Sequence, residues 1–326
     1  MLSASIFHRI TNADTKIDLL LIIMKLNIAD ISLRASISFT LLVISSVLHA
    51  ESLLLSVTPN EFTKGIIWRI DKAGVESSYL LGTMHTDGPG IRKVLGEAQP
   101  YLHQVKTVCT EIKMDFEALA VELRAMFFTD GRSLEEVLDD PPTYLVAMQK
   151  ARMHGLDPAM VRYMKPFTLA FILSMPMTQG EVLDSQIYNQ ALRANKQVCG
   201  LETIEEHQST FLVFDMPAQI SILKNTLTNY DEYKALAPLL LDAYLQRDLQ
   251  KIITLASPSM FLGDKAITQT FVQRFLIDRN HLMVKRMQPY LQAGAVFFAV
   301  GAMHLTGEEG ILQLLQKRGY SISVIY

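Results

Sequence analysis

Two histidines in this chain each follow a glycine by three positions, where an apolar segment ends. The motifs are Gly-Thr-Met-His at residues 82–85 and Gly-Ala-Met-His at residues 301–304. Histidine is the commonest side-chain metal ligand and a natural general base near neutral pH. A glycine ahead of it lets the backbone turn sharply or approach a neighbour closely. One such histidine would more often be a hydrogen-bonded structural residue. The repetition of the Gly-x-x-His motif indicates one shared site built from His85 and His304.

Other motifs that would indicate a common hydrolase or nucleotide site are missing from the sequence. It has no His-Glu-x-x-His, no Gly-x-Ser-x-Gly and no Gly-x-x-x-x-Gly-Lys-Ser/Thr, which excludes a standard zincin, the usual serine esterase and an ordinary P-loop NTPase. The remaining histidines of the expected domain lie in segments with helical spacing, without a partner at ligand spacing. They are interpreted as surface or ordinary core residues: His103, His154, His207 and His281.

The elements expected to position the two histidines are strands at both ends of the chain and helices between them. Strand-like segments lie at residues 65–70, 78–81, 105–111, 196–202, 295–300 and 321–325, and the first two form a plausible hairpin. Helical spacing dominates residues 115–195, 204–291 and 307–317. The pattern predicts an α/β (α+β) fold with a mixed central sheet flanked by helices. A large helical insertion separates the two Gly-x-x-His strands.

The carboxyl ends of strands in such a sheet open onto the ligand crevice, which is where both histidines are expected. Thr306 and Glu309 have capping-box spacing, so a helix is expected to start immediately beyond His304. Its N-terminal amides would favour an anion or a metal-bound hydroxide in the crevice.

The first fifty residues resemble a secretory signal peptide rather than part of the fold. An uncharged, largely apolar stretch at residues 37–47 follows Lys25 and Arg34 and ends near Ala50. That stretch is too short to span a bilayer comfortably, which disfavours a permanent anchor. Met24 is the more natural start of such a signal. We therefore expect a single domain over residues 51–326, periplasmic or secreted, with no stable membrane span after cleavage.

Composition narrows the partners. The chain has 30 Lys and Arg residues against 33 Asp and Glu residues, and it has no stripe of basic residues. The sequence therefore predicts that the protein does not bind nucleic acid. Export would allow a disulfide between Cys109 and Cys199. Two buried thiols explain the same residues equally well. Two cysteines are too few for a cysteine-based zinc site.

Several segments together resemble the TraB/GumN family, which includes the Tiki-type proteases and is related to ChaN-like and erythromycin-esterase-like proteins. The resemblance covers nearly all of the expected mature chain and is most specific at the second histidine motif. It is carried by residues 80–85, Glu111, residues 165–167, Gly180 with Asp184, residues 200–203, Arg279 with Asn280, residues 300–305, Gly307, Gly310 and residues 319–320.

The resemblance implies a mixed α/β fold in which both Gly-x-x-His turns meet, and metal-dependent peptide cleavage for Tiki-type members. It further implies roles for six residues: His85 and His304 as metal ligands, Glu111 as a ligand or general base, Glu202 as a second catalytic carboxylate, and Arg279 with Asn280 as groups that orient substrate or stabilise an oxyanion.

The leading hypothesis is thus an exported metal-dependent hydrolase acting on a peptide or small-molecule substrate. The divalent ion is undetermined, because zinc, manganese and cobalt all suit two histidines and a carboxylate. Two alternatives stay open at this point. One is a ChaN-like protein that binds haem, metal or peptide without turnover, and the other is a metal-independent hydrolase with His85 or His304 as its base.

Overall fold

The computed structural model describes residues 62–176, 178, 180–256 and 262–326. The expected signal segment and the alternative start at Met24 lie outside the described residues. Within them, no helix is long and apolar enough to cross a membrane.

The described strands form a six-stranded mixed sheet in the order β4-β3-β5-β2-β1-β6. Parallel pairing joins β2 to β5, β5 to β3 and β3 to β4, while β1 is antiparallel to both β2 and β6. The predicted mixed sheet and first hairpin are therefore confirmed. The strands are β1 (Ile67–Asp71), β2 (Ser78–Thr83), β3 (Thr107–Ile112), β4 (Gln197–Glu202), β5 (Val296–Gly301) and β6 (Ser321–Val324).

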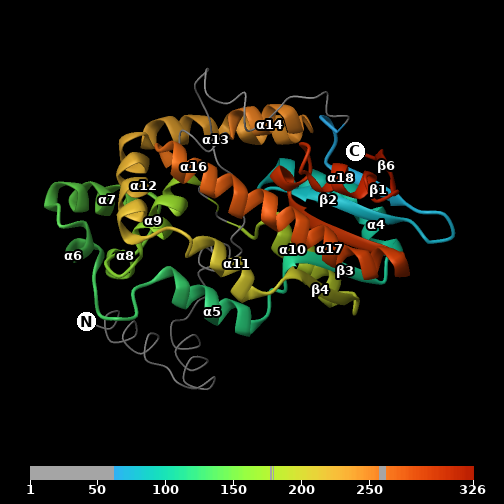
Figure 1. Ribbon diagram of the computed structural model, residues 1–326, viewed down its shortest axis with the longest axis horizontal. Helices are drawn as coiled ribbons and strands as arrows, with labels where there is room; N and C mark the ends of the chain where they lie inside the picture. Colours follow the sequence, from blue (N-terminus) through green and yellow to red (C-terminus); the bar gives the residue numbers. More distant parts are fainter. Residues whose placement is uncertain (1–61, 177, 179, 257–261) are drawn as a thin grey trace.

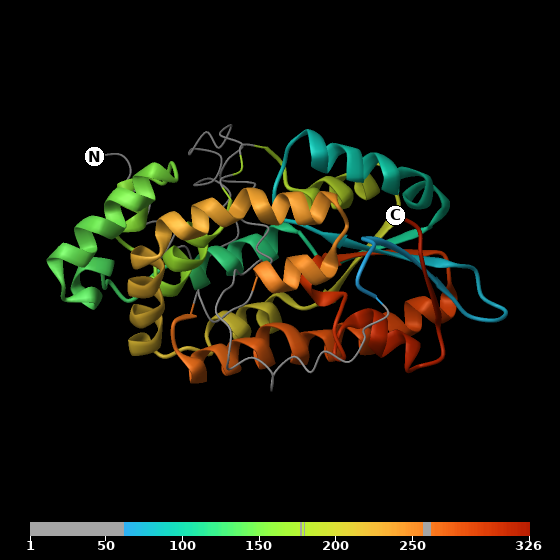
Figure 2. The same ribbon diagram turned by 90° about the horizontal axis from the view of Figure 1, so that it is seen from above.

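Helices cover both faces of this sheet. Figure 2 shows α4 (Pro89–Gln104) and α10 (Leu183–Arg193) on one face, and α17 (Asp278–Ala293) with α18 (Ile311–Gln316) on the other. Strand β5 between these layers is buried along its whole length. This matches its fully apolar sequence, since a central parallel strand is covered on both faces.

The predicted helical insertion extends from one end of the sheet (Figure 1). Several of its helices begin at an aspartate whose side chain accepts a backbone N–H, as Asp140, Asp215 and Asp264 do. It has its own apolar core, in which Phe167 packs against Phe214 and Phe275. The remaining helices are α5 (Phe116–Met126), α6 (Leu134–Leu138), α7 (Pro141–Met153), α8 (Pro158–Val161), α9 (Pro166–Ser174), α11 (Ile204–Phe211), α12 (Met216–Thr228), α13 (Tyr230–Leu245), α14 (Leu249–Leu255), α16 (Lys265–Phe271) and the π-helix η2 (Val272–Ile277).

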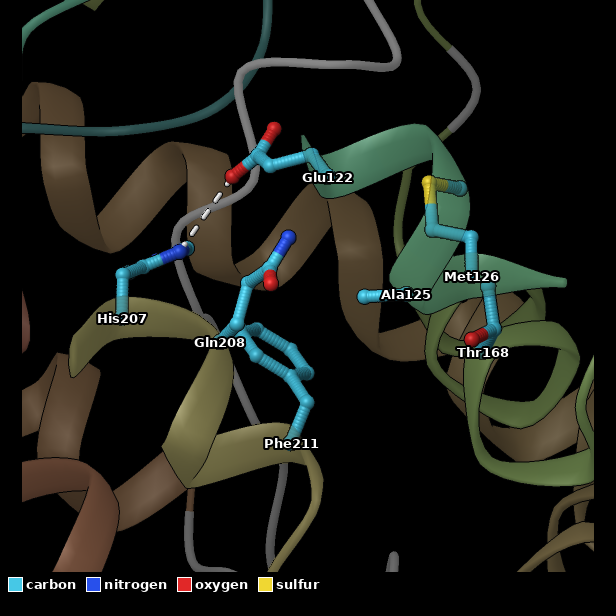
Figure 3. Close-up of a pocket in the computed structure, with 7 residues that line it drawn as sticks. All are labelled: Glu122, Ala125, Met126, Thr168, His207, Gln208 and Phe211. Carbon is cyan, nitrogen blue, oxygen red and sulfur yellow. Dashed lines mark ion pairs between the residues drawn. The ribbon is translucent and has the colours of Figure 1, made fainter. Parts of the chain in front are cut away.

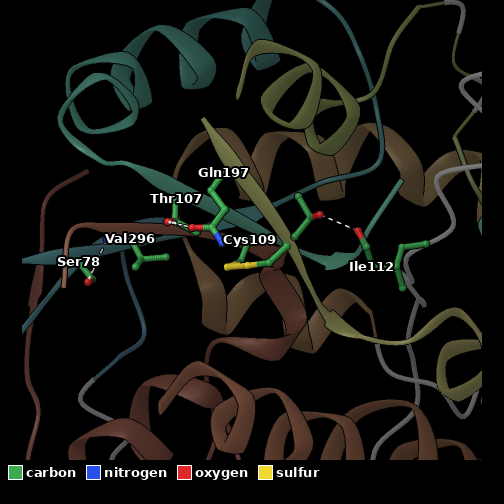
Figure 4. Close-up of a disulfide and its surroundings, with 8 residues drawn as sticks. Ser78, Thr107, Cys109, Ile112, Gln197 and Val296 are labelled. Atoms are coloured by element: carbon green, nitrogen blue, oxygen red, sulfur yellow. Dashed lines mark hydrogen bonds between the residues drawn. A yellow bond between two sulfur atoms is a disulfide. The ribbon is translucent and has the colours of Figure 1, made fainter. Parts of the chain in front are cut away.

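Cys109 and Cys199 form a disulfide between neighbouring strands (Figure 4). They occupy the same register position on β3 and β4, and their Cα atoms are 4.5 Å apart. Of the two interpretations that the sequence left open, the structure shows the disulfide. It joins the two strands whose ends carry Glu111 and Glu202.

The helix expected directly after His304 does not start there. Residues Ala302–His304 form a short 3-10 helix, and α18 begins only at Ile311 with Gly310 as its N-cap. The predicted capping box is therefore wrong. Glu309 has other partners, because its carboxylate lies 2.6 Å from His281 Nε2 and its carbonyl accepts a hydrogen bond from Asn280.

Candidate functional site

The two Gly-x-x-His turns lie side by side because they end adjacent parallel strands. Thr83 on β2 is in register with Gly301 on β5. Gly82 permits this approach: a Cβ at that position would lie 2.5 Å from Leu305 Cδ1 and 3.1 Å from the Ala302 Cα. Both histidines that follow are buried, with 6% of His85 and 1% of His304 exposed. The structure thus brings together the two motifs that the sequence singled out.

His304 is held in one tautomer by Asn280. The Asn280 Nδ2 donates to the Glu309 carbonyl at 2.7 Å, which assigns the amide orientation and leaves Oδ1 facing His304 Nδ1 at 2.6 Å. Nδ1 therefore carries the proton, and Nε2 presents its lone pair. Burial, partly opposed by Glu111, lowers the pKa of His304 to about 3. The imidazole is accordingly neutral at physiological pH and suited to metal binding or to accepting a proton.

Arg279 joins the two strand-end carboxylates. Its Nε lies 3.0 and 2.9 Å from the two Glu202 carboxylate oxygens, and one terminal nitrogen lies 2.6 Å from both Glu202 Oε2 and Glu111 Oε2. Burial opposes the charge, but the two carboxylates raise the pKa of Arg279 above its ordinary value. This guanidinium is therefore a permanent cation between two buried anions.

Glu111 lies at the centre of the site. Its Oε1 accepts the Gly301 backbone N–H at 2.6 Å and lies 3.8 Å from His304 Nε2. Burial alone would raise the pKa of this carboxyl, but Arg279, His304 and the Gly301 N–H outweigh it, and the pKa falls to about 2. Glu111 is therefore an ionised carboxylate that contacts both Arg279 and the second Gly-x-x-His motif.

Arg279 and Asn280 reach the site from the first turn of α17. That helix follows the π-helix η2 without a break, and the Phe275 carbonyl in η2 lies 3.5 Å from an Arg279 terminal nitrogen. π-helical turns within α-helices are frequent at functional sites. Both side chains point inward, and only 2% of Arg279 and 3% of Asn280 is exposed.

His85 has a different partner, Asp184 of α10. Its Nε2 lies 3.4 Å from Asp184 Oδ2, and the hydroxyl of Thr83 donates to Asp184 Oδ1 at 2.6 Å. Among the described residues, neither His85 ring nitrogen nor Asp184 Oδ2 has a hydrogen-bond partner. Burial raises the pKa of Asp184, against the opposing effect of His85.

In the sequence, Asp184 contributes to the family resemblance as a weaker candidate, without an assigned role in the site. The signal that would have found it is a carboxylate on an otherwise apolar helix face, since Leu183 and Ile187 beside it are fully buried. Burying a carboxylate costs free energy unless the carboxylate is paired or hydrogen-bonded. An aspartate on such a helix face is therefore a candidate site residue.

The donor atoms fit a divalent metal ion in kind. His304 offers the Nε2 lone pair, and the ionised Glu111 has Oε1 3.8 Å from that nitrogen. His85 and Asp184 offer buried atoms with no hydrogen-bond partner in the described structure. As described, the structure does not bring three His, Cys, Asp or Glu side chains together at metal-ligand spacing. All six predicted site residues nevertheless gather at the same sheet edge.

Comparison with known proteins identifies the family of this chain. The model of the TraB/PrgY/gumN family matches residues 66–324, which include both histidine motifs. The chain belongs to this family. The predicted resemblance is thereby confirmed. Among curated proteins, the metalloprotease TIKI1 of Danio rerio is 26% identical over 163 residues, covering 43% of this chain and 33% of that protein. The chain thus spans about a third of the length of that relative. No solved structure matches.

Proposed function

We propose that this TraB/PrgY/gumN protein is an exported metal-dependent hydrolase that acts on peptides. The observation that carries the proposal is the meeting of His85 and His304 from adjacent strands, beside the ionised Glu111. Similarity to a protein named a metalloprotease supports the reaction class. The signal-like N-terminal sequence supports export.

His85, His304 and Glu111 would hold the divalent ion. Zinc, manganese and cobalt all accept two imidazoles and a carboxylate. When bound, such an ion polarises the scissile carbonyl and lowers the pKa of a bound water. Asn280 keeps Nε2 of His304 unprotonated. Arg279 and the Gly301 N–H hold Glu111 ionised and in place.

The proton-transfer role falls to Asp184 better than to either glutamate. A pKa of about 2 makes Glu111 a weak base at neutral pH. Both oxygens of Glu202 accept hydrogen bonds from Arg279. The raised pKa of Asp184 and its position beside His85 suit a group that takes and returns a proton. In this proposal Glu202 and Arg279 position Glu111 rather than touch substrate.

Elemental analysis of the purified protein tests the metal. Wild type should contain about one divalent ion per chain, and His85→Ala and His304→Ala should both lose it. His103→Ala is the matched control, because His103 is an exposed histidine in the last turn of α4. Absence of metal after reconstitution with zinc, manganese and cobalt would rule out the proposed mechanism.

A metal-independent hydrolase is the second candidate, and the Thr83–Asp184–His85 alignment favours it. An aspartate beside a histidine is the pairing found in hydrolases that use histidine as a general base, and here the two side chains lie 3.4 Å apart. Under this candidate, hydrolysis survives exhaustive chelation and is lost in Asp184→Asn. Under the metal-dependent proposal, chelation abolishes hydrolysis and added metal restores it.

The N-terminus of the mature protein tests export. Sequencing it from a periplasmic or secreted fraction should show a start close to Glu51. An intact Met24 or Met1 in a cytoplasmic fraction would contradict export while leaving the site chemistry untouched.

A further inference from the structure

A pocket lies between α5 and α11 (Figure 3). It is separate from the group of site residues around His85, His304 and Glu111, called the histidine cluster below. The pocket has about 30 Å³ of space for water-sized groups and opens to solvent. That is about twice the space that one water needs, enough for the charged end of one side chain rather than for a whole ligand. Ala125, Met126 and Phe211 supply apolar wall. Glu122, His207 and Gln208 supply the polar groups.

The polar groups of this pocket are buried without being satisfied. Only 5% of Glu122 and 1% of His207 is exposed. Glu122 Oε1 lies 3.2 Å from His207 Nδ1, yet neither atom makes a hydrogen bond in the described structure, and the same holds for His207 Nε2 and Gln208 Nε2. Buried polar atoms left in this state are unfavourable. A bound ligand that supplies the missing partners would remove the penalty.

The pocket adjoins the histidine cluster. His207 lies on α11, which starts immediately after Glu202 and Thr203. Phe211 packs against Phe275 with 5.3 Å between ring centroids, and the Phe275 carbonyl contacts Arg279. A peptide held at the histidine cluster could therefore place a neighbouring side chain in this pocket.

We infer that the pocket is a subsite for a basic side chain, lysine or arginine, of a peptide ligand. The inference rests on the proposed function. Glu122 is a buried carboxylate in the lining of a largely apolar pocket, and the described lining residues include no lysine or arginine. An ammonium or guanidinium group would donate to Glu122 Oε1, which has no hydrogen-bond partner in the described structure.

The walls suit the rest of such a side chain. The aliphatic stem of lysine or arginine packs on apolar surface while its charged end reaches a polar partner. Ala125 and Met126 provide that surface, and the ring of Phe211 attracts a cation over its face. A neutral side chain would leave Glu122 without a cation, and an acidic one would be repelled.

Equilibrium binding of short labelled peptides tests the inference without requiring turnover. Alanine-based hexapeptides carry one lysine, norleucine or glutamate at the same position, and fluorescence anisotropy measures their binding to the full chain. Wild type should bind the lysine peptide about tenfold or more tightly than the norleucine peptide, as a charge-assisted hydrogen bond predicts. Glu122→Gln should abolish that preference and leave norleucine binding unchanged.

Glu135→Gln is the matched control, because Glu135 is exposed on α6 and lines no part of the pocket. It should keep the lysine preference. Circular dichroism melting confirms that both variants fold, and Glu122→Asp should restore part of the preference if the glutamine variant is unstable. Equal binding of lysine and norleucine peptides to wild type, or an undiminished preference in a folded Glu122→Gln, would overturn the inference. So would binding of none of the peptides.

Cleavage of the same peptides is followed separately by mass spectrometry. Cleavage without a lysine preference overturns the subsite and leaves the proposed hydrolase standing. A Glu122-dependent lysine preference without cleavage supports the subsite and counts against the hydrolase.

Discussion

His304 Nδ1 lies 2.6 Å from Asn280 Oδ1, between residues that are 24 positions apart in the chain. Because Asn280 also donates to the Glu309 carbonyl, its amide cannot turn over without losing a bond. The asparagine therefore acts on the histidine ring as a fixed acceptor. It determines which imidazole nitrogen faces Glu111 and Arg279.

Replacing Asn280 by alanine should weaken the site without removing a ligand. The freed imidazole would exchange tautomers and rotate, and loss of such support lowers metal affinity or activity by roughly 10–100-fold. Competitive metal titration and peptide turnover measure both effects. Asn189→Ala is the control, since Asn189 bonds to Glu181 away from the histidines. Unchanged affinity and turnover in Asn280→Ala would refute the positioning role.

Arg279→Met should unfold far more readily than wild type. The substitution leaves Glu111 and Glu202 buried together without their shared cation, and breaking a buried ion pair destabilises by about 3–5 kcal/mol. Urea unfolding at neutral pH measures the loss. Arg132→Met breaks the solvent-exposed pair with Asp130 and should leave stability almost unchanged, because water screens that pair. Adding Glu202→Gln to Arg279→Met should recover part of the loss, because one uncompensated charge is gone. Additive effects of the two changes would contradict the coupling.

Stability of the chelator-treated protein should fall as the pH drops below about 6.5. The ordinary pKa of a histidine side chain is 6.5, and burial lowers the pKa of His304 to about 3 in the fold. The unfolded chain therefore takes up this proton first, and folding loses on the order of 1 kcal/mol per pH unit over that window. Glu111 adds a further loss between pH 4.5 and about 2, since its pKa is lowered from 4.5 to about 2.

Thermal melting from pH 7.5 to 4.5 checks the histidine part. His304→Gln should make the profile less steep over that range, and the remaining slope comes from His154, whose pKa burial lowers to about 4. His103→Gln, at an exposed position, should leave the profile unchanged. An equally steep profile in His304→Gln would assign the pH dependence to other groups.

The disulfide should contribute a substantial part of the stability. Cys109 and Cys199 are 90 positions apart, and closing a loop of that length stabilises by roughly 2–5 kcal/mol. The double alanine variant should lose that amount in urea unfolding, and reduced wild type should match it. Thiol titration under denaturing conditions should find no thiol before reduction. Two reactive thiols in protein from an oxidising compartment would contradict the bond.

The strand sequences and both histidine motifs were predicted from the sequence because their signals are local. An apolar run such as residues 296–300 indicates a strand buried on both faces, and the structure has β5 there. The predicted mixed sheet with a helical insertion also follows from the order of such segments along the chain. The start of α18 was misplaced, since capping-box spacing at Thr306 and Glu309 does not reveal that Glu309 pairs with His281.

The partners of the site residues were decided by the tertiary structure. The sequence shows Glu111, Glu202 and Arg279 as separate charges, and only strand order and the approach of α17 make them one cluster. Asp184 beside His85, and Glu122 beside His207, become visible only when distant helices pack together. The reason is physical: spacing along a chain reports backbone periodicity, whereas a pKa, a tautomer or an unsatisfied polar atom depends on which distant groups share the same buried volume.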